Sequence, residues 1–198
     1  MKSIVIASGN EHKIEEFRAM FKPLGIEVIG MKECGEMEEV QETGATFAEN
    51  AVIKAEYLMK KLNQPVISDD SGLEIDALNR EPGVYSARYL GHDTSYELKN
   101  RTLVERMKDK TDRTCRFVCA IALARPGHPT RVFEGIVEGI VARQPEGDHG
   151  FGYDPIFYYP PLGRTLAQIS EQEKNAISHR GKAMRKLMEF WQHEEVAD

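Results

Sequence analysis

Two adjacent aspartates, Asp69 and Asp70, follow a short apolar run and are well suited to metal-assisted hydrolysis. Carboxylates at the end of a buried strand are costly unless a cation or hydrogen-bond donors pair with them. Hard oxygen ligands suit Mg²⁺, which also binds waters and substrate phosphates. A carboxylate beside such an ion can orient or deprotonate an attacking water. The alternative is that Asp69-Asp70-Ser71-Gly72 is an acidic turn whose side chains satisfy local backbone groups.

An acidic segment upstream could complete the metal site. Glu42 could join the aspartate pair, although the segment that also holds Glu38 and Glu39 could equally be a solvated loop. Spacing alone does not choose among these glutamates. Asn50 and Lys54 lie one turn apart on the following predicted helix, where they could face a site or only solvent.

The segment Ser8-Gly9-Asn10-Glu11-His12-Lys13 joins a predicted strand to a predicted helix. Free backbone N–H groups at such a helix start can bind phosphate, and Lys13 adds a positive charge. It is not a Walker A loop, because the GxxxxGK[ST] spacing is missing. The alternative is an ordinary capped turn with a solvated lysine.

A further candidate group lies toward the C-terminus. Phe151-Gly152-Tyr153-Asp154-Pro155 offers an aromatic face and a carboxylate on a constrained loop. His179 and Arg180 fall in the first turn of a predicted helix, where N–H donors are free. Because an arginine there opposes the helix dipole, a nearby anion or acceptor makes it better tolerated. The alternative is that Lys174 and Arg180 are surface charges.

Hydrophobic periodicity predicts the elements that position these groups. Strands are expected at 4–7, 27–29, 66–68, 117–123 and 132–142. Helices are expected after the N-cap residue Asn10, after the capping-box pair Thr46 and Glu49, over 95–107, and from Ser178. Loops are expected over 31–44 and over 147–161, the second with an embedded short strand, and a turn is expected over 69–72. Strands and helices interleave and one long pair of strands looks antiparallel, so the predicted class is α/β with a mixed sheet.

Composition limits the function classes. The formal net charge is −6 and no block of like charges stands out, so a global basic field for nucleic acid is absent. An anionic substrate would therefore need local positive groups or a metal ion. No signal peptide and no apolar run of membrane-spanning length is expected. The three cysteines are odd in number and form no CxxC, which favours a reduced, cytoplasmic setting.

Six motifs occur in order over residues 8–180. They are Ser8-Gly9-Asn10-x-x-Lys13, Glu42-Thr43-Gly44-x-Thr46-Phe47-x-x-Asn50-Ala51, Ser68-Asp69-Asp70-Ser71-Gly72-Leu73, Pro82-Gly83-Val84-Tyr85-Ser86-Ala87-Arg88-Tyr89, Phe151-Gly152-Tyr153-Asp154-Pro155 and Glu173-Lys174-Asn175-x-Ile177-Ser178-His179-Arg180. Together they resemble the inosine/xanthosine triphosphate pyrophosphatase family, enzymes that remove non-standard purine nucleotides. The segment from Leu90 to Thr114 matches the family pattern little.

The resemblance implies an α/β fold with an elongated mixed β-sheet, flanking helices, and two lobes around a central nucleotide-binding cleft. It implies a single bilobed domain over 1–198, a homodimer, and no nucleic-acid or membrane partner. The implied activity is Mg²⁺-dependent hydrolysis of XTP, ITP and dITP to the monophosphate and pyrophosphate, with water attacking the α-phosphorus. Such an activity cleanses the nucleotide pool and keeps these bases out of DNA and RNA.

The same resemblance assigns roles to residues. Asp70 is expected to be the proton acceptor and a metal ligand, Glu42 the second metal carboxylate, and Asp69 a support. The expected substrate-binding residues are Ser8, Gly9, Asn10, Glu11, His12, Lys13, Ser71, Phe151, Gly152, Tyr153, Asp154, Lys174, His179 and Arg180.

Hydrogen-bond polarity could select the base. Hypoxanthine and xanthine present a 6-keto acceptor, so donors from Arg180 or His179 would pair with it and would oppose the 6-amino group of adenine. Phe151 could stack on the ring. Two other functions stay open: a related pyrophosphatase for pyrimidine nucleotides, and a nucleotide-binding regulatory module without hydrolysis. The intact set of Glu42, Asp69, Asp70 and Lys13 disfavours the module.

Overall fold

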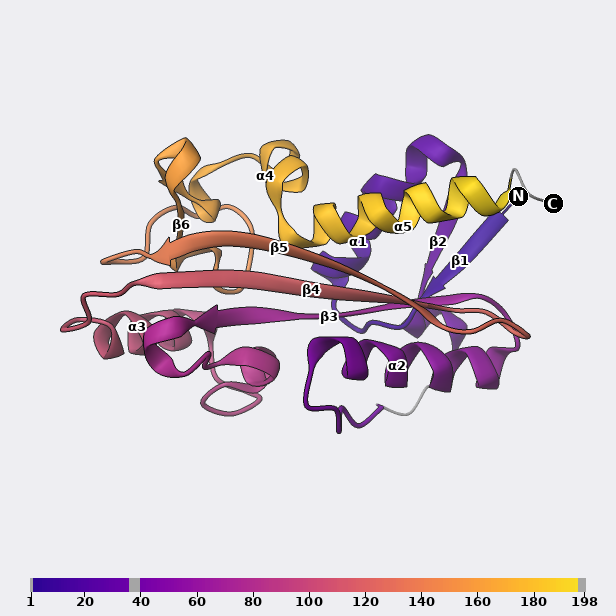
Figure 1. Ribbon diagram of the computed structural model, residues 1–198, viewed down its shortest axis with the longest axis horizontal. Coiled ribbons are helices and arrows are strands. Elements are labelled where there is room, and N and C mark those ends of the chain that lie inside the picture. The colour runs from indigo at the N-terminus through magenta and orange to yellow at the C-terminus, as the bar shows by residue number, and fades with distance from the viewer. Residues whose placement is uncertain (1, 36–39, 196–198) are drawn as a thin grey trace. The chain divides into compact units, whose positions relative to one another are not determined.

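The computed structural model describes residues 2–35 and 40–195, which form a mixed sheet with flanking helices (Figure 1). The strands are β1 Lys2–Ile6, β2 Ile26–Gly30, β3 Val66–Ile75, β4 Thr114–Ala124, β5 Arg131–Val141, β6 Phe157–Tyr159 and β7 Arg164–Thr165. The helices are α1 Glu11–Phe21, α2 Phe47–Leu62, α3 Tyr96–Arg106, α4 Glu171–Ile177 and α5 His179–Glu195. The predicted α/β class with a mixed sheet is confirmed.

Within the described residues the strand order is β2-β1-β3-β4-β5-β6-β7. Strand β1 pairs in parallel with β2 and with β3, whereas β6 pairs antiparallel with β5 and with β7. Parallel neighbours need crossover connections, and α1 and α2 supply them. The carboxyl end of β1 therefore runs into the start of α1, where Ser8 to Lys13 lie.

The chain divides into two compact units. Unit 1 comprises Met1–Asp70, Cys119–Glu134 and Ala183–Asp198, and unit 2 comprises Ser71–Val118 and Gly135–Lys182. Strands β3, β4 and β5 and helix α5 each contribute residues to both units. The expectation of one bilobed domain over 1–198 stays a prediction.

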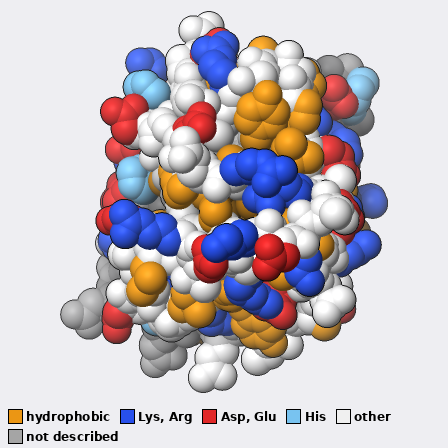
Figure 2. All heavy atoms as spheres, turned by 90° about the vertical axis from the view of Figure 1, so that its left-hand side faces the viewer, with side chains coloured by type: hydrophobic (Ala, Val, Ile, Leu, Met, Phe, Trp, Pro, Cys, Tyr) orange, Lys and Arg blue, Asp and Glu red, His pale blue; other side chains and the backbone are white. Residues whose placement is uncertain are grey.

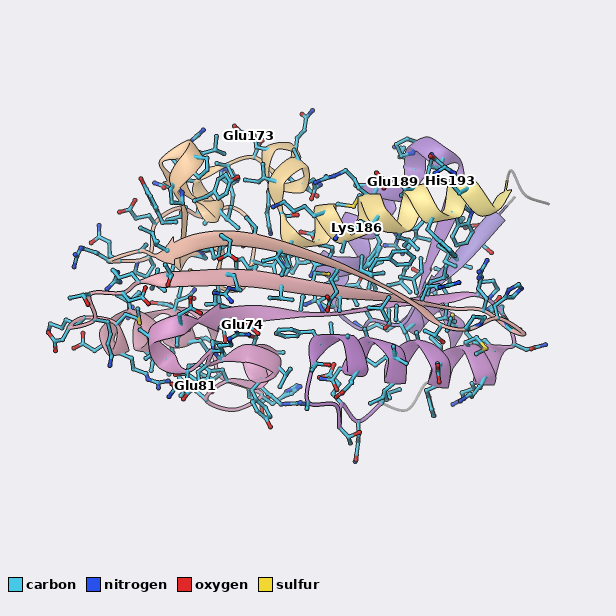
Figure 3. All side chains as sticks on the ribbon, viewed as in Figure 1. Glu74, Glu81, Glu173, Lys186, Glu189 and His193 are labelled. Atoms are coloured by element: carbon cyan, nitrogen blue, oxygen red, sulfur yellow. The ribbon has the colours of Figure 1, made fainter. Side chains whose placement is uncertain are left out.

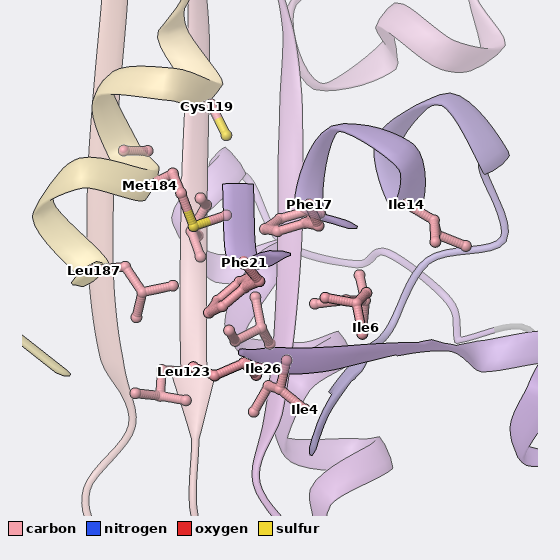
Figure 4. Packing of buried hydrophobic residues seen from close by; sticks show 14 residues of the cluster. Ile4, Ile6, Ile14, Phe17, Phe21, Ile26, Cys119, Leu123, Met184 and Leu187 are labelled. Carbon is pink, nitrogen blue, oxygen red and sulfur yellow. The ribbon is translucent and has the colours of Figure 1, made fainter. Parts of the chain in front are cut away.

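Unit 1 buries both faces of β1, as the alternation of side chains along a strand allows. Ile4 and Ile6 pack with Phe17 of α1 and Met184 of α5 in one cluster (Figure 4). Val5 and its strand-end neighbour Ala7 belong to a second cluster, with Leu58 of α2 and Val66 of β3. Helix α2 therefore covers one face of this part of the sheet, and α1 and α5 cover the other (Figure 1).

Capping fixes where the two N-terminal helices begin. The Asn10 side chain accepts hydrogen bonds from the backbone of α1, and Thr46 Oγ1 accepts one from Glu49 N at 3.1 Å in α2. Such caps satisfy donors that a helix start leaves without an intrahelical partner. The Glu49 carboxylate accepts from Ala45 N at 2.7 Å, one residue before the position that a capping box uses.

Unit 2 has its own core. Leu103 and Met107, from α3 and the residue that follows it, are fully buried with Cys115 and Phe117 of β4. The Phe117 ring stacks on Phe157 of β6 at a centroid distance of 4.6 Å. Parallel-offset ring contacts of this kind add to the hydrophobic stabilisation of the core.

The local structure differs from expectation at three places. Residues 69–72 form no turn, because β3 continues to Ile75. Side chains within the fold satisfy the polar groups of this strand: Ser68 Oγ donates to Ala51 O, and Leu73 N donates to Ser86 Oγ at 2.9 Å. Within the expected loop at 31–44, residues 31–34 form a 3₁₀ turn, while Glu38 and Glu39 lie outside the described residues. Helix α4 had no predicted counterpart.

The surface carries charges of both signs. Lys186, Glu189 and His193 are exposed on α5 (Figure 3), and Lys186 Nζ donates to Glu134 O at 2.7 Å. On the face in Figure 2, Lys and Arg side chains lie among acidic and hydrophobic ones. No helix in the described part of the chain combines the length and the apolar character that crossing a membrane requires.

Candidate functional site

Strand β3 carries two buried carboxylates, and they belong to the last two residues of the first segment of unit 1. Asp69 is 1% exposed and Asp70 is 7% exposed. Lys13 of α1 reaches Asp69, with Nζ 3.1 Å from Oδ2. The two side chains form a nearly buried ion pair, so Lys13 is not the solvated lysine of the alternative interpretation.

Lys54 of α2 links the upstream glutamate to the aspartates. Its Nζ lies 2.7 Å from Glu42 Oε1 and 3.7 Å from Asp70 Oδ1, and donates to Asp69 O at 2.8 Å. The ammonium group therefore draws the Glu42 and Asp70 carboxylates toward a common cation. This contact places Glu42 beside the aspartates, whereas Glu38 and Glu39, the other glutamates considered, lie outside the described residues.

Asn50, one turn before Lys54, is fully buried and uses both ends of its amide. Its Nδ2 donates to Asp70 Oδ2 at 3.1 Å, and its Oδ1 accepts from Gly44 N at 2.8 Å. A Cβ at Gly44 would lie 2.7 Å from that Oδ1, so only glycine lets the Glu42 segment come so close. Asn50 thus fixes both carboxylate-bearing segments. Together, Lys13, Glu42, Asn50, Lys54, Asp69 and Asp70 are called the acidic cluster.

The electrostatics of the acidic cluster favour an added cation. Burial raises the pKa of Asp70, and Glu42 raises it further, although Lys54, Lys13 and the Asn50 amide oppose the shift. Burial by itself would lower the pKa of Lys54, but the charges of Asp70, Glu42 and Asp69 outweigh it and raise that pKa. The carboxylates are therefore not fully compensated by the two lysines.

The donor set fits a hard divalent ion. Within residues 2–35 and 40–195, no three or more His, Cys, Asp or Glu side chains come together as a metal-binding group. Mg²⁺ needs no such group, because it is commonly bound by one or two carboxylates plus substrate phosphates and water. The convergence of Glu42 and Asp70 on one ammonium group supplies two carboxylates of that kind.

At the helix start from Ser8 to Lys13, more of the backbone N–H groups are already hydrogen-bonded than expected. Asn10 Oδ1 accepts from His12 N at 3.0 Å and from Lys13 N at 3.4 Å, and Asn10 N donates to Ser8 Oγ at 3.2 Å. The expectation of free N–H groups is therefore wrong for His12 and Lys13, because the cap already uses those donors. Gly9 and Glu11 are exposed in the same segment.

In unit 2 a second cluster surrounds the partly exposed Phe151 ring. Lys174 Nζ lies 4.5 Å and the Arg180 guanidinium carbon 5.9 Å from the ring centroid, within the range of cation–π attraction. Lys174 Nζ is also 2.7 Å from Asp154 Oδ2, and Arg180 Nη2 donates to Ser71 Oγ at 3.1 Å. Both cations are buried, so the surface-charge alternative is wrong. Ser71, Phe151, Asp154, Lys174 and Arg180 are called the aromatic cluster.

Close packing shapes the loop that carries Phe151. Phe151 N donates to Asp154 Oδ2 at 2.9 Å. Gly150 has φ +70°, and a Cβ there would lie 2.2 Å from the same carboxylate oxygen. Tyr153 is buried, and its hydroxyl donates to Ser86 O at 2.6 Å. The loop therefore presents Phe151 while Tyr153 and Asp154 hold it from inside.

The junction of α4 and α5 sets the position of Arg180. A Cβ at Gly181 would lie 2.0 Å from Asn175 O, so this glycine permits the close approach of the two helices. Gly181 N donates to Ser178 Oγ at 3.0 Å. The neighbouring His179 is 6% exposed and stacks on Phe117 at 4.8 Å. That packing places His179 in the core of unit 2, and its predicted contact with substrate stays a prediction.

Half of the predicted catalytic, metal-binding and substrate-binding residues thus fall into one of two clusters, one in each unit. The residues outside both are Ser8, Gly9, Asn10, Glu11, His12, Gly152, Tyr153 and His179. The sequence leaves open whether Asn50 and Lys54 face a site or solvent. The signal that favours a site for Asn50 is its polar side chain beside the apolar stripe of the helix. Asn100 was missed altogether, although it lies three and seven residues before the core residues Leu103 and Met107. A polar residue on a helix's core face is a signal that periodicity can supply.

Comparison with known proteins places the chain in a class. The model of the Ham1 family matches residues 4–190, and the chain belongs to that family. The chain is 49% identical over 195 residues to a protein of Geobacillus kaustophilus named dITP/XTP pyrophosphatase, covering 97% of this chain and 95% of that protein. It is 48% identical to the Staphylococcus aureus protein of the same name, covering 98% of each chain.

Solved structures agree with this placement. The Staphylococcus aureus Ham1 protein superposes with a TM-score of 0.90 at 48% identity, covering 98% of this chain and 100% of that one. A HAM1 protein from Coxiella burnetii gives a TM-score of 0.90 at 42% identity, with the same coverage. The fold described above is therefore the fold of the family.

Proposed function

We propose that this chain hydrolyses non-standard purine nucleoside triphosphates, namely XTP, ITP and dITP, to the monophosphate and pyrophosphate. The observation that carries the proposal is the acidic cluster, in which Asn50 and Lys54 hold Asp70 beside Glu42. Relatives with nearly full-length similarity are named dITP/XTP pyrophosphatases. The chain would thereby cleanse the nucleotide pool and keep these bases out of DNA and RNA.

In this proposal Asp70 accepts a proton from the attacking water. The water oxygen bonds to the α-phosphorus, the bond to the β-phosphate oxygen breaks, and pyrophosphate leaves. Burial raises the pKa of Asp70, which makes its carboxylate a stronger base than an exposed aspartate. Lys13 offsets charge on the phosphates, and Asp69 holds Lys13 in place.

Glu42 and Asp70 are the proposed ligands of Mg²⁺. When bound, the ion supplies charge neutralisation on the phosphate oxygens. Asn50 keeps the two carboxylate segments together, and Lys54 shares their charge. Removal of divalent ions with a chelator should abolish turnover, and added Mg²⁺ should restore it.

The aromatic cluster is the proposed base site. The Phe151 ring would stack on the purine, and Arg180 and Lys174 would donate toward a 6-keto group. Ser71, Gly152, Tyr153, Asp154 and His179 complete the predicted set, and Ser8 to Lys13 contribute at the phosphate end. By the family resemblance the enzyme is a homodimer of the cytoplasm. The cysteines are consistent with that compartment, because no disulfide joins them.

The test is a turnover panel with Mg²⁺ and XTP, ITP, dITP, GTP, ATP and dUTP, measuring pyrophosphate and orthophosphate separately. Pyrophosphate from XTP, ITP and dITP with little from ATP or GTP is the expected result. Orthophosphate as the direct product would overturn attack at the α-phosphorus, and preference for dUTP would favour the pyrimidine alternative. Binding without any turnover would favour the regulatory module.

A further inference from the structure

Asn100 of α3 is a buried side chain that contacts the loop carrying Phe151. It is 3% exposed, and its Nδ2 donates to the Gly152 carbonyl oxygen at 3.0 Å. A carbonyl oxygen can only accept, so this contact fixes the orientation of the amide, with Nδ2 toward the loop. The bond spans 52 residues of sequence and restrains the residue immediately after Phe151.

A second contact from the same helix face supports the first. Tyr96 lies one turn before Asn100, so the two side chains project from one face of α3. The Tyr96 ring meets the Tyr153 ring edge-on at a centroid distance of 5.2 Å. Helix α3 therefore holds the two residues that follow Phe151, one by its backbone and the other by its ring.

Asn100 is poorly suited to a purely stabilising role. Its buried Oδ1 has no hydrogen-bond partner among the residues that the structure describes. Leu103 and Met107, on the same side of the helix, are fully buried and apolar. A buried amide that leaves its acceptor unpaired loses the solvation of that group without replacing it. Packing against Leu103 and Met107 alone would be served as well by an apolar side chain, so the amide at this position is explained by its bond to Gly152.

We propose that Asn100 is a positioning residue for base recognition: through the Gly152 carbonyl it fixes the Phe151 ring, over which Lys174 and Arg180 lie, in the orientation that stacks on a purine. The inference rests on the proposed function of the aromatic cluster. The flanking residues Gly150 and Gly152 both have positive φ and, as glycines, impose few conformational limits of their own. The restraint from Asn100 therefore adds, at Gly152, to those that Tyr153 and Asp154 supply from inside the loop.

The test compares Asn100→Leu and Asn100→Ala with wild type and with Arg101→Ala. Leucine has the same branched heavy-atom skeleton as asparagine but larger methyl groups, and alanine removes the donor without adding volume, so Tm is measured for both variants beside the kinetics. Arg101 lies on the same helix but is exposed, and its ion-pair partner among the described residues is the equally exposed Glu97, so its replacement should leave every readout unchanged. Steady-state kinetics are measured with ITP, XTP and ATP.

Both Asn100 variants should raise KM for ITP and XTP about tenfold, the scale of one well-placed hydrogen bond, with kcat little changed. Turnover of ATP should change little, so the preference for ITP over ATP should fall by a similar factor. A merely structural role would instead lower Tm and the active fraction while leaving KM unchanged. An unchanged KM and base preference in folded Asn100→Leu would overturn the proposal.

Hydrogen–deuterium exchange of the peptide over 147–156 tests the restraint without any substrate. Exchange in this peptide should be faster in both Asn100 variants than in Arg101→Ala. Unchanged exchange in both variants would overturn the positioning role. Wild-type protein that releases no pyrophosphate from ITP or XTP would instead overturn the proposed function, and the exchange result would still report on the loop.

Discussion

The acidic cluster and the aromatic cluster both pair a lysine with a buried aspartate, yet their charge balances are opposite. The acidic cluster sets three carboxylates against the ammonium groups of Lys13 and Lys54. The aromatic cluster sets the single carboxylate of Asp154 against Lys174 and Arg180. The first arrangement favours a further cation, and the second favours an electron-rich acceptor such as a keto oxygen. Under the proposed function, this difference in charge balance separates the site for chemistry from the site for base recognition.

The two clusters also differ in how they are held. Asn50 uses both ends of its amide, joining the Glu42 segment to Asp70. Asn100 uses only Nδ2, and it holds backbone instead of a charged group. Changes in the acidic cluster should therefore act mainly on kcat, whereas changes around Phe151 should act mainly on KM. The following variants test that division.

Asp70→Asn should have the largest effect. An amide cannot accept the proton from water, so kcat should fall about 10²- to 10⁴-fold with KM much less affected. Turnover of ITP with Mg²⁺ measures the loss, and circular dichroism verifies the fold. Asp112→Asn, at an exposed aspartate of unit 2, is the matched control and should retain full activity. Wild-type kcat in Asp70→Asn would remove Asp70 from the mechanism.

Removing one lysine from each cluster compares the two buried ion pairs. Lys174→Ala leaves Asp154, 2% exposed, without its 2.7 Å partner, and should cost about 3–5 kcal/mol of unfolding free energy. Lys13→Ala should cost less, because Lys54 still lies beside the aspartates. Urea unfolding of both variants gives the two values. A larger loss for Lys13→Ala would contradict this order.

Two glycine substitutions separate kcat from KM. Gly44→Ala drives a Cβ to within 2.7 Å of Asn50 Oδ1, and Gly150→Ala drives one to within 2.2 Å of Asp154 Oδ2. Overpacking of this kind costs about 1–3 kcal/mol. Gly44→Ala should lower kcat, and Gly150→Ala should raise KM for ITP. Gly127→Ala, at positive φ like Gly150 but in open space, controls for the backbone strain of Gly150→Ala and should change neither constant.

The smallest predicted effect is on the pH dependence of stability without metal. Burial raises the pKa of Asp70 above its ordinary 3.8, so the folded state binds this proton more tightly than the unfolded state. Stability contributed by Asp70 is therefore present below pH 3.8 and is lost as the pH rises through the raised pKa. Asp70→Asn should accordingly unfold at a higher urea concentration at pH 7 with a chelator present.

At pH 3 the difference between Asp70→Asn and wild type should shrink, because Asp70 is protonated in both states. At Asp112 the pKa shift has the opposite direction, because hydrogen bonds from Thr114 lower the pKa of its carboxyl group. Its contribution is present above 3.8 and is lost as the pH falls through the lowered pKa, so Asp112→Asn should be less stable than wild type at pH 7. If both variants were more stable than wild type at pH 7, or both less stable, the result would contradict these two pKa shifts.

Sequence periodicity predicted most elements because their signals are local. Asn10 and Thr46 mark helix starts with side chains that cap within four residues, and the apolar 117–123 run lies within β4. The prediction of a turn at 69–72 is wrong because Asp, Ser and Gly favour turns by their own local preference, whereas here they continue a strand. Their partners Lys13, Asn50 and Lys54 come from other elements, and no local pattern reveals that pairing.

The candidate residues were predicted mainly by motif resemblance. Spacing did not select Glu42 over its neighbours, whereas the structure shows its contact with Lys54. Tyr153 and Asp154 are buried and support the loop through Ser86 and Lys174, and their expected contact with substrate stays a prediction. Asn100 lies in the segment that matches the family pattern little, so its contact with Gly152 emerged only from the fold.

The uneven burial of the three cysteines makes the protein convenient to label. Cys115 and Cys119 are fully buried, whereas Cys34 is partly accessible. Burial raises the pKa of the Cys115 thiol strongly and that of Cys34 as well, so thiolate-directed reagents should react slowly and at Cys34 first. A single maleimide fluorophore could then be attached without mutagenesis, on the segment that leads toward Glu42.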